Sequence, residues 1–365
     1  FFNEDFGLPG YEGFLNTESL TLAEVFRNGG YSTYMTGKWH VGNEKPHWPL
    51  QRGFDEFFGF LDGGASYFDT KPLLKGPPSI AYLYEGNEVY NIDKKDFYLT
   101  DELTERAFEF IKSTPEEKPF FLYMAYNAPH WPLHAKPADI AKYKGKYDAG
   151  WDELRKLRFE NIKKLGLANE DWNLFKDKLL PSWDSLDAEE KKQWTLKMEV
   201  YAAMVDNLDQ NIGKLLDYLE STQQLDNTVI VFLSDNGAEN MDVGKMPFTV
   251  KRKEGPVGTA GSMEAYTKNW AQVSNSPLRS YKSSPYEGGT ATPFIIRYPN
   301  LKESGKILKG GNHVVDIMPT LLNIAQIDYP KTYNGIQTNA LPGESFLPLL
   351  QGENWNREQP ICFEI

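Results

Sequence analysis

Cysteine is nearly absent from this sequence. Cys362 is the only cysteine in 365 residues, so no disulfide can form within the chain. No apolar run approaches the roughly 18 residues of a transmembrane helix, and no Asn-x-Ser/Thr acceptor for N-glycosylation occurs. These absences exclude a disulfide-stapled scaffold, and we predict no membrane span.

Positive charge is also in short supply. The chain carries 39 Lys and Arg against 51 Asp and Glu, a net charge of −12. An acidic chain argues against a nucleic-acid-binding surface. It does not exclude an anionic substrate, because a local pocket of lysine and histidine can oppose the overall sign. The 40% of hydrophobic residues suffice for a buried core.

Repeats and low-complexity linkers are absent, and apolar strands followed by polar loops recur instead. Apolar residues at helical spacing predict helices through Leu22–Phe26, Leu103–Ile111 and Met198–Leu219. Short apolar runs predict strands at 32–36, 120–126, 228–233 and 294–298, with 120–126 and 228–233 buried. We therefore predict an α/β fold, a mostly parallel central sheet with helices on both faces.

A charged segment interrupts this alternation between residues 138 and 190. Lys, Asp, Glu and Trp dominate there, and strand signals vanish. We interpret the segment as a helical surface insertion. It could be a solvated lid or could shape one wall of a substrate cleft, and the sequence does not choose between the two.

Lys38 and His40 follow the first predicted strand, in a glycine-framed segment from Gly30 to Gly42. On an extended backbone, positions i and i+2 point to the same side, so a cation and an imidazole would project together, with Trp39 opposite. The plain alternative is a solvated lysine and a capping histidine at a strand end.

Other polar side chains lie near the ends of the remaining strands: His130, Asp235, Asn236 and Lys282. Ligands of open α/β sheets bind beyond the carboxyl ends of the strands, so we expect these groups and Lys38 and His40 to share one cleft. Asp235 and Asn236 supply adjacent hard oxygen ligands, which suit Ca²⁺ or Mg²⁺ better than Zn²⁺. Alone, Asp-Asn-Gly is also a common turn.

The segment from Gly30 to Gly42 resembles the second signature of the sulfatase family, Gly-Tyr-x-Thr-x-x-x-Gly-Lys-x-His-x-Gly, at every specified position. Similar matches occur at 129–132, at 235–236 and between Lys282 and Glu287-Gly288-Gly289. The chain is similar to bacterial, formylglycine-dependent arylsulfatases of the alkaline-phosphatase-like superfamily. This resemblance implies a sulfuric ester hydrolase. A phosphonate monoester or phosphodiester hydrolase, or an inactive sulfatase-like binding protein, remains an alternative.

The resemblance also implies roles for the matched residues. Lys282 and His130 would hold the sulfate, and one of them would protonate the leaving oxygen. Lys38 would anchor the formylglycine nucleophile and contact the substrate, and His40 would take a proton from that nucleophile. Asp235 and Asn236 would ligate Ca²⁺ or Mg²⁺, with Asp235 also able to act as a base.

Several family features are missing from the chain. No Cys/Ser-x-Pro/Ala-x-Arg nucleophile motif precedes Lys38, no Asp-Asp pair ends an early strand, and Ala291 replaces the usual Arg. We expect a chain truncated at both ends and inactive alone. Residues 1–355 would form an α/β domain without its first strand, and 356–365 would start an antiparallel subdomain. His47, His134 and His313 are interpreted as structural or cleft-rim residues, with His313 ordering a helix start.

The expected partners follow from this interpretation. The substrate would be a small-molecule or carbohydrate sulfate ester. A formylglycine-generating enzyme would modify a Cys or Ser outside the 365 residues. We expect a periplasmic or secreted protein rather than a cytoplasmic one.

Overall fold

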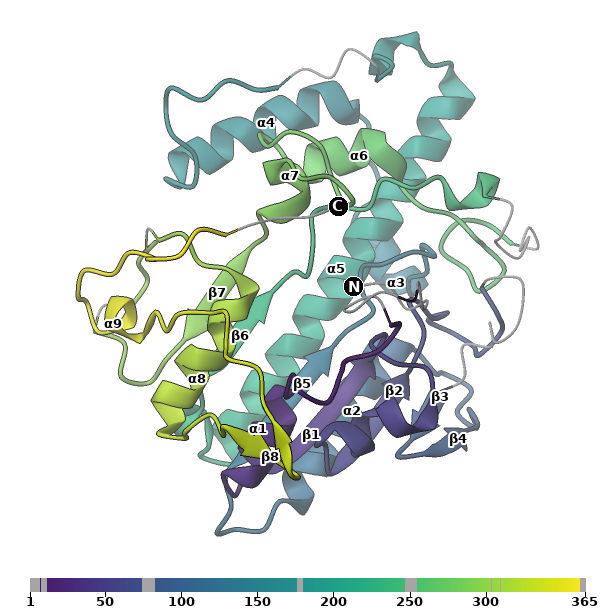
Figure 1. Cartoon of the computed structure of the whole chain (residues 1–365). Helices are drawn as coiled ribbons and strands as arrows, with labels where there is room; N and C mark the ends of the chain where they lie inside the picture. The colour runs from purple at the N-terminus through teal and green to yellow at the C-terminus, as the bar shows by residue number, and fades with distance from the viewer. Residues whose placement is uncertain are drawn as a thin grey trace.

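A five-stranded mixed sheet forms one part of the molecule. The computed structural model describes residues 7, 12–73, 83–175, 180–246, 255–302, 304–308 and 310–361. The strands lie in the order β4-β3-β2-β1-β5, and β1 is parallel to both β2 and β5. The carboxyl ends of these three strands therefore share one edge of the sheet. Their bounds are β1 Ser32–Lys38, β2 Glu56–Phe60, β3 Leu83–Glu85, β4 Glu88–Tyr90 and β5 Phe120–Ala125 (Figure 1).

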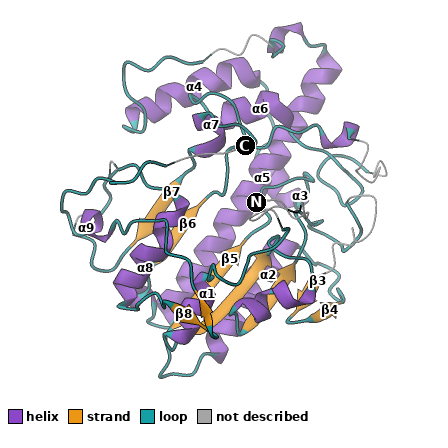
Figure 2. Cartoon of the chain, in the orientation of Figure 1, coloured by secondary structure: helices purple, strands orange, loops and turns teal. Residues whose placement is uncertain are grey.

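Helices cover both faces of this sheet (Figure 2). Side chains of β1 alternate between the faces. Met35 packs with Ala23 of α1 (Leu22–Asn28) on one face. Tyr34 joins the opposite core cluster, to which α2 (Leu99–Ser113) and α5 (Ala188–Ser221) contribute. The α/β class predicted from the sequence is confirmed.

A buried ion pair fixes α1 against the start of β2. Glu24 forms a capping box with Thr21, and its carboxylate also accepts from Arg52 Nε at 3.0 Å. Both charged side chains are almost fully buried. Asp55, three residues beyond Arg52, accepts from the Thr33 backbone N–H at 2.9 Å. These contacts hold β1 and β2 in register at the amino-terminal ends of the two strands.

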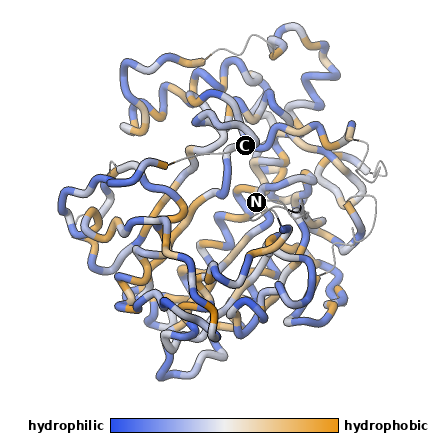
Figure 3. Tube along the Cα trace, viewed as in Figure 1, coloured by the Kyte–Doolittle hydropathy of each residue, from blue (hydrophilic) through white to orange (hydrophobic). Residues whose placement is uncertain are grey.

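A second sheet lies apart from the first. It pairs β6 (Ile230–Leu233) with β7 (Phe294–Arg297) antiparallel, and no described strand joins it to β5. The prediction that 120–126 and 228–233 are buried was wrong, because Tyr123 is 48% exposed and Phe232 36% exposed. The edges of β5 and β6 that face each other are unpaired within the described chain, although both strands belong to hydrophobic stretches (Figure 3).

The space between β5 and β6 is a cavity of about 2770 Å³, here called the inter-sheet cavity. It is lined by 119–130, by 226–239, and by one apolar face of α5 that includes Leu208, Ile212 and Leu215. The same apolar periodicity predicted α5, which is confirmed and begins earlier, at a capping box of Asp187 and Glu190. α8 (Ile317–Ala325) closes the other side and packs against α1 through Leu322.

The charged segment 138–190 contains most of α3 (Pro137–Ala141), all of α4 (Gly150–Lys164) and the start of α5, and its other described residues form turns, loops and one 3₁₀ turn. Trp151 at the start of α4 packs edge-on against Trp183 and Trp270. Leu157 and Arg158 of the same helix line the inter-sheet cavity. Part of α4 therefore contributes to the cavity wall, while most of its other side chains are exposed or half-buried.

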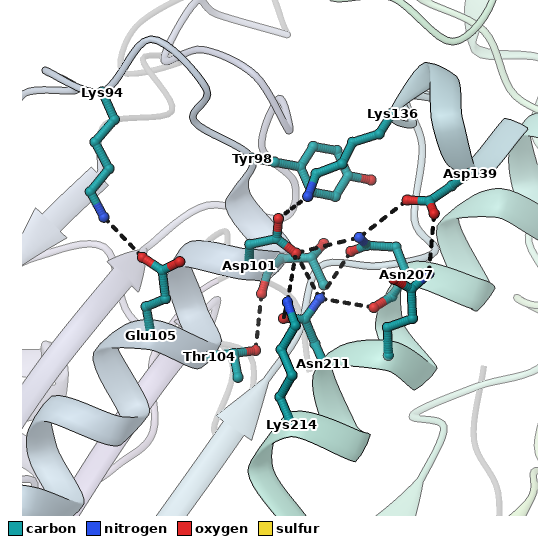
Figure 4. Close-up of polar contacts among 12 residues, drawn as sticks. Lys94, Tyr98, Asp101, Thr104, Glu105, Lys136, Asp139, Asn207, Asn211 and Lys214 are labelled. Carbon is teal, nitrogen blue, oxygen red and sulfur yellow. Dashed lines mark hydrogen bonds and ion pairs between the residues drawn. The ribbon is translucent and has the colours of Figure 1, made fainter. Parts of the chain in front are cut away.

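A polar network ties α2, α3 and α5 together below this wall (Figure 4). Asp101 of α2 accepts from Lys136 and from Asn211 Nδ2 at 2.8 Å. Asn207 Nδ2 bridges Asp101 at 3.3 Å and Asp139 at 3.4 Å. The network anchors the chain between β5 and α3, which carries His130.

The remaining elements are short. No helix in the described ranges is long and apolar enough to cross a membrane. Residues 356–361 carry no helix or strand, and Cys362 lies outside the described residues. The other bounds are α6 Thr267–Ser274, α7 Glu287–Thr290, α9 Leu347–Leu350, β8 Thr332–Tyr333, β9 Ile336–Gln337, and 3₁₀ turns η1 Lys45–His47, η2 Pro49–Arg52, η3 Trp183–Ser185, η4 Leu225–Asn227, η5 Val243–Lys245 and η6 Val314–Asp316.

Candidate active site

The predicted site residues meet in the lining of one cavity. Three strands deliver them: β1 ends at Lys38, His130 follows β5, and Asp235 follows β6. The loop before β7 adds Lys282 from the other sheet. The inter-sheet cavity is lined by all of the predicted residues: Lys38, His40, His130, Asp235, Asn236 and Lys282. The shared cleft expected from strand-end placement is present.

The backbone turns sharply where β1 ends. Gly37 has φ +109°, and a Cβ there would stand 2.0 Å from the Ala125 carbonyl oxygen, so only glycine fits beside β5. His40 adopts φ +53° in the left-handed region, so the extended backbone assumed in the prediction stops short of it. Its N–H donates to the Leu61 carbonyl at 3.0 Å. Trp39 lies in the buried cluster on the α1 face, as predicted.

The environment of Lys38 and His40 disfavours positive charge. Burial lowers the pKa of Lys38, and the Lys282 charge lowers it further, whereas Asp235 and Glu239 act in the opposite direction. Burial, followed by Lys38 and Lys282, lowers the pKa of His40 to about 4. His40 is therefore a neutral imidazole at pH 7 and can accept a proton.

His130 is neutral as well, and its tautomer is set. Burial, Lys282 and Lys38 lower its pKa to about 3. Nδ1 lies 2.8 Å from the Trp131 carbonyl oxygen, which can only accept, so Nδ1 carries the proton. Nε2 then bears a lone pair. The Tyr67 hydroxyl donates to the His130 carbonyl at 2.9 Å and fixes the loop.

Asp235 and Asn236 lie on a tight turn after β6. Gly237 N–H donates to the Gly289 carbonyl at 3.0 Å, and a Cβ on Gly237 would stand 1.7 Å from the Gly288 carbonyl oxygen. Gly237 is therefore needed for the turn to pack on α7. Asn236 Nδ2 donates to the Gly237 carbonyl at 2.8 Å, which leaves Oδ1 as an acceptor.

The donor set at this turn fits Ca²⁺ or Mg²⁺ in kind but not in number. A carboxylate and an amide oxygen are ligands that these hard cations prefer, and Ca²⁺ takes about 6–8 of them. No group of three or more His, Cys, Asp or Glu in the described ranges could hold a metal ion. Asp235 and Asn236 thus stay predicted ligands of a site that needs further oxygens.

Lys282 is held next to a residue that the sequence analysis missed. Its backbone N–H donates to the Ala238 carbonyl at 3.0 Å, and its Nζ lies 3.1 Å from Glu239 Oε2. Glu239 follows Asp235 by four positions on the same strand-end turn. Its place just after β6 is the one feature of the sequence that could have predicted Glu239 as a site residue.

A second missed segment follows β2. Gly63 and Gly64 lie so close to the imidazole rings of His40 and His130 that a Cβ would stand 2.9 Å and 3.4 Å from them. Burial raises the pKa of the preceding Asp62 to about 6. The parallel pairing of β2 with β1 places this segment at the same sheet edge, and the aromatic run 57–60 could have predicted the strand.

The other histidines lie outside the cavity lining, in agreement with their structural interpretation. His134 is fully buried, and its Nε2 lies 2.9 Å from the Ser262 carbonyl. His47 stacks on Phe14. His313 caps η6, as predicted, by accepting from Val315 N–H at 3.3 Å.

Glu287, whose usual arginine partner is replaced by Ala291, points elsewhere. It is exposed at the start of α7 and lines a separate cavity of about 590 Å³ with Trp172, Arg279 and Tyr286. No ion pair of Glu287 occurs within the described chain. The arginine's absence thus coincides with a glutamate that faces solvent.

A family model described as Sulfatase matches residues 3–327. An uncharacterized sulfatase of Schizosaccharomyces pombe is 38% identical over 89% of this chain and 61% of its own length. The chain belongs to the sulfatase family. An arylsulfatase of Klebsiella aerogenes is 36% identical over 91% of the chain and 73% of its own length. Sulfatase relatives thus occur in a yeast as well as in bacteria, and the bacterial source expected from the sequence is not borne out.

Solved sulfatase structures share the fold. The crystal structure of Ps i-CgsB in complex with k-i-k-neocarrahexaose has a TM-score of 0.59 and 28% identity, over 91% of this chain and 58% of that one. A phosphonate monoester hydrolase of Agrobacterium radiobacter has a TM-score of 0.52 at 16% identity, which is a likeness of fold alone. This sulfatase chain spans 61% and 73% of the curated relatives above. The comparisons do not bear out the expected truncation.

Proposed function

We propose that the protein is a sulfuric ester hydrolase that cleaves a sulfate monoester in the inter-sheet cavity. One observation carries this proposal: in a chain of the sulfatase family, Lys38 and Lys282 from two different sheets line one cavity together with His40 and His130. These two half-buried lysines oppose the net charge of −12 where an anionic group would bind. Preorganised donors of this kind are each worth roughly 3–4 kcal/mol in comparable sites.

The lysines are the cations of the proposed site. Both histidines have pKa values lowered to about 4 and about 3, so they enter the reaction neutral. Lys282 is therefore the better of the two predicted proton donors for the leaving alcohol oxygen. His130 would contact sulfate as a donor only after its Nε2 takes up a proton, which a bound anion favours.

His40 is the proposed base, and its lowered pKa of about 4 makes it a weak one that needs an acidic proton donor. Its neutral ring accepts a proton without first losing one, and its backbone is held by the bond to Leu61. In the net reaction the sulfate ester and water yield an alcohol and hydrogen sulfate. The proton that Lys282 gives to the alcohol oxygen is thus balanced by the one that His40 receives.

The proposed reaction also needs a nucleophile and a divalent cation. A formylglycine made by a formylglycine-generating enzyme would supply the attacking oxygen, and Lys38 would anchor that group, as the family resemblance implies. A Ca²⁺ or Mg²⁺ ion held by Asp235 and Asn236 would neutralise sulfate oxygens when bound. A periplasmic or secreted location stays a prediction.

The substrate class that we propose is an aryl or carbohydrate sulfate. The arylsulfatase relative supports the first, and the complex of Ps i-CgsB with k-i-k-neocarrahexaose supports the second. The size of the inter-sheet cavity, about 2770 Å³, leaves room for either. The part of the cavity wall that α4 contributes, with Leu157 and Arg158, would help to decide between them.

The test compares hydrolysis of an aryl sulfate, a sulfated oligosaccharide and an aryl phosphodiester. It uses the full-length protein as its gene encodes it, produced together with a formylglycine-generating enzyme. We expect sulfate release from the sulfate esters, and a loss of at least tenfold in kcat for Lys282→Ala. Preferred turnover of the phosphodiester would favour the phosphohydrolase alternative. Sulfate binding without turnover of any of the three esters would favour the binding protein.

A further inference from the structure

Glu239 is a buried charge inside the proposed anion site, and the mechanism above does not use it. The residue is 9% exposed and lines the inter-sheet cavity. Its Oε1 accepts from the backbone N–H groups of Asn240 at 2.8 Å and Met241 at 2.9 Å. These two bonds fix the plane of the carboxylate, so the other oxygen has a fixed direction.

That second oxygen faces Lys282. Oε2 of Glu239 lies 3.1 Å from Nζ of Lys282, and the two side chains are 10% and 27% exposed. Oε2 is shut off from solvent and has no partner that meets hydrogen-bond angles within the described chain. The contact is therefore an ion pair held mainly by charge, and the ammonium keeps N–H donors for a ligand.

The loop after β6, which carries Glu239, and the loop before β7, which carries Lys282, are joined by hydrogen bonds that do not involve the Glu239 side chain. Asn275 Oδ1 accepts from Ala238 N–H at 3.1 Å, and Asn275 Nδ2 donates to the Gly288 carbonyl at 2.7 Å. Lys282 N–H bonds to the Ala238 carbonyl. A change at Glu239 should thus release the lysine head group while leaving the loops in place.

A carboxylate beside an anion site weakens anion binding, so its presence needs a compensating gain. Lys38 and Lys282 repel each other across the cavity, and the flexible lysine side chain of Lys282 has several rotamers to lose. We propose that Glu239 is a positioning residue: it sets the Lys282 ammonium for proton donation, and the site gives up ground-state affinity for the sulfate in return. This inference rests on the proposed function.

The variant that tests it is Glu239→Gln, which keeps size and removes the charge. We expect inorganic sulfate to bind 3–10-fold more tightly, because one negative charge leaves the cavity. We expect kcat for a sulfate ester to fall at least tenfold and KM to fall with it, because Lys282 loses its fixed place. A purely structural residue would lower the melting temperature and weaken binding instead.

A matched control exists nearby. Asp242 pairs with Lys245 at 2.7 Å, but their side chains are 38% and 85% exposed and neither lines the cavity. Asp242→Asn should leave sulfate affinity, kcat and KM unchanged. Glu239→Asp keeps the charge, so sulfate affinity should stay close to wild type, while the shorter side chain should still lower kcat.

The outcomes separate this inference from the proposed function. Sulfate affinity, measured by calorimetry, is defined even where no ester is hydrolysed. Unchanged or weaker sulfate binding by Glu239→Gln overturns the inference, as does an unchanged kcat in the full-length protein. If that protein hydrolyses no sulfate ester at all, the proposed function fails, and tighter sulfate binding still supports the charge effect of Glu239. If Glu239→Gln does not fold, wild-type kcat in Glu239→Asp overturns the inference.

Discussion

At the scale of single residues, the site is defined by which groups carry charge. Spacing and motif predicted Lys38, His40, His130, Asp235 and Lys282, and the cavity lining contains them all. Their protonation could not be predicted in the same way. It depends on burial and on charges from the other sheet, which become neighbours only when the chain folds.

The lowered pKa of His40 predicts a measurable dependence of protein stability on pH. Its pKa is about 4 in the folded protein against 6.5 in an unfolded chain, so the unfolded state binds more protons between these values. Stability is therefore fully present above pH 6.5 and is lost as the pH falls toward 4. Across pH 7 to 5 the loss from this one residue is roughly 2 kcal/mol.

The corresponding variant is His40→Gln, compared with wild type by urea denaturation at pH 7 and pH 5. Acidification from pH 7 to pH 5 should lower the free energy of unfolding of the variant by about 2 kcal/mol less than that of wild type. An equal decrease in the free energy of unfolding in both proteins would show that His40 is not held in its neutral form. Comparing differences removes the contribution of carboxylates that titrate in both.

At the scale of elements, periodicity in the sequence predicted the helices and most strands. The exposure of each strand was decided by its contacts with neighbouring elements. The apolar stripe from Met198 to Leu219 predicted α5 because the spacing of its apolar residues is a local property of the sequence and does not depend on neighbouring elements. The same reasoning failed for the exposure of β5 and β6. An apolar run shows that a strand is fit for burial, but its burial depends on the strands beside it, which no local pattern contains.

The network around Asp101 is another element-scale feature that no motif marked. It joins α2, α3 and α5 through Lys136, Asn207 and Asn211 (Figure 4). Its removal leaves several inward-facing donors without an acceptor, each of which costs free energy when buried. The helices then lose their common anchor.

We expect Asp101→Ala to lower the free energy of unfolding by about 2–3 kcal/mol, measured by urea denaturation. Glu153→Ala is the control, because Glu153 pairs with Lys156 at 2.6 Å while both side chains are 59% exposed. That change should stay within about 0.5 kcal/mol of wild type. Equal effects of the two substitutions would mean that the network contributes nothing beyond a surface pair.

At the scale of the whole molecule, the main departure from expectation is that two sheets replace one. The sequence supports a single α/β sheet because parallel order is inferred from alternating helices and strands. β7 instead returns antiparallel to β6, and the facing edges of β5 and β6 carry no described partner. β1 is paired on both sides.

Amide hydrogen exchange should report this difference. Amides of β1 are bonded within the sheet, and we expect strong protection there. Alternate amides along β5 and β6 face the cavity, and we expect them to exchange faster than their neighbours by tenfold or more. Uniform protection along β5 would contradict open edges.

The site residues are divided between the two sheets. Lys38, His40 and His130 belong to the sheet of β1 and β5, whereas Asp235 and Lys282 belong to the side of β6 and β7. A sulfate bound by Lys38 and Lys282 at once would be a noncovalent crosslink between the two halves of the molecule. Ligand binding would then stiffen the cavity walls and raise the melting temperature with sulfate concentration, so the anion would help to hold together the fold that binds it.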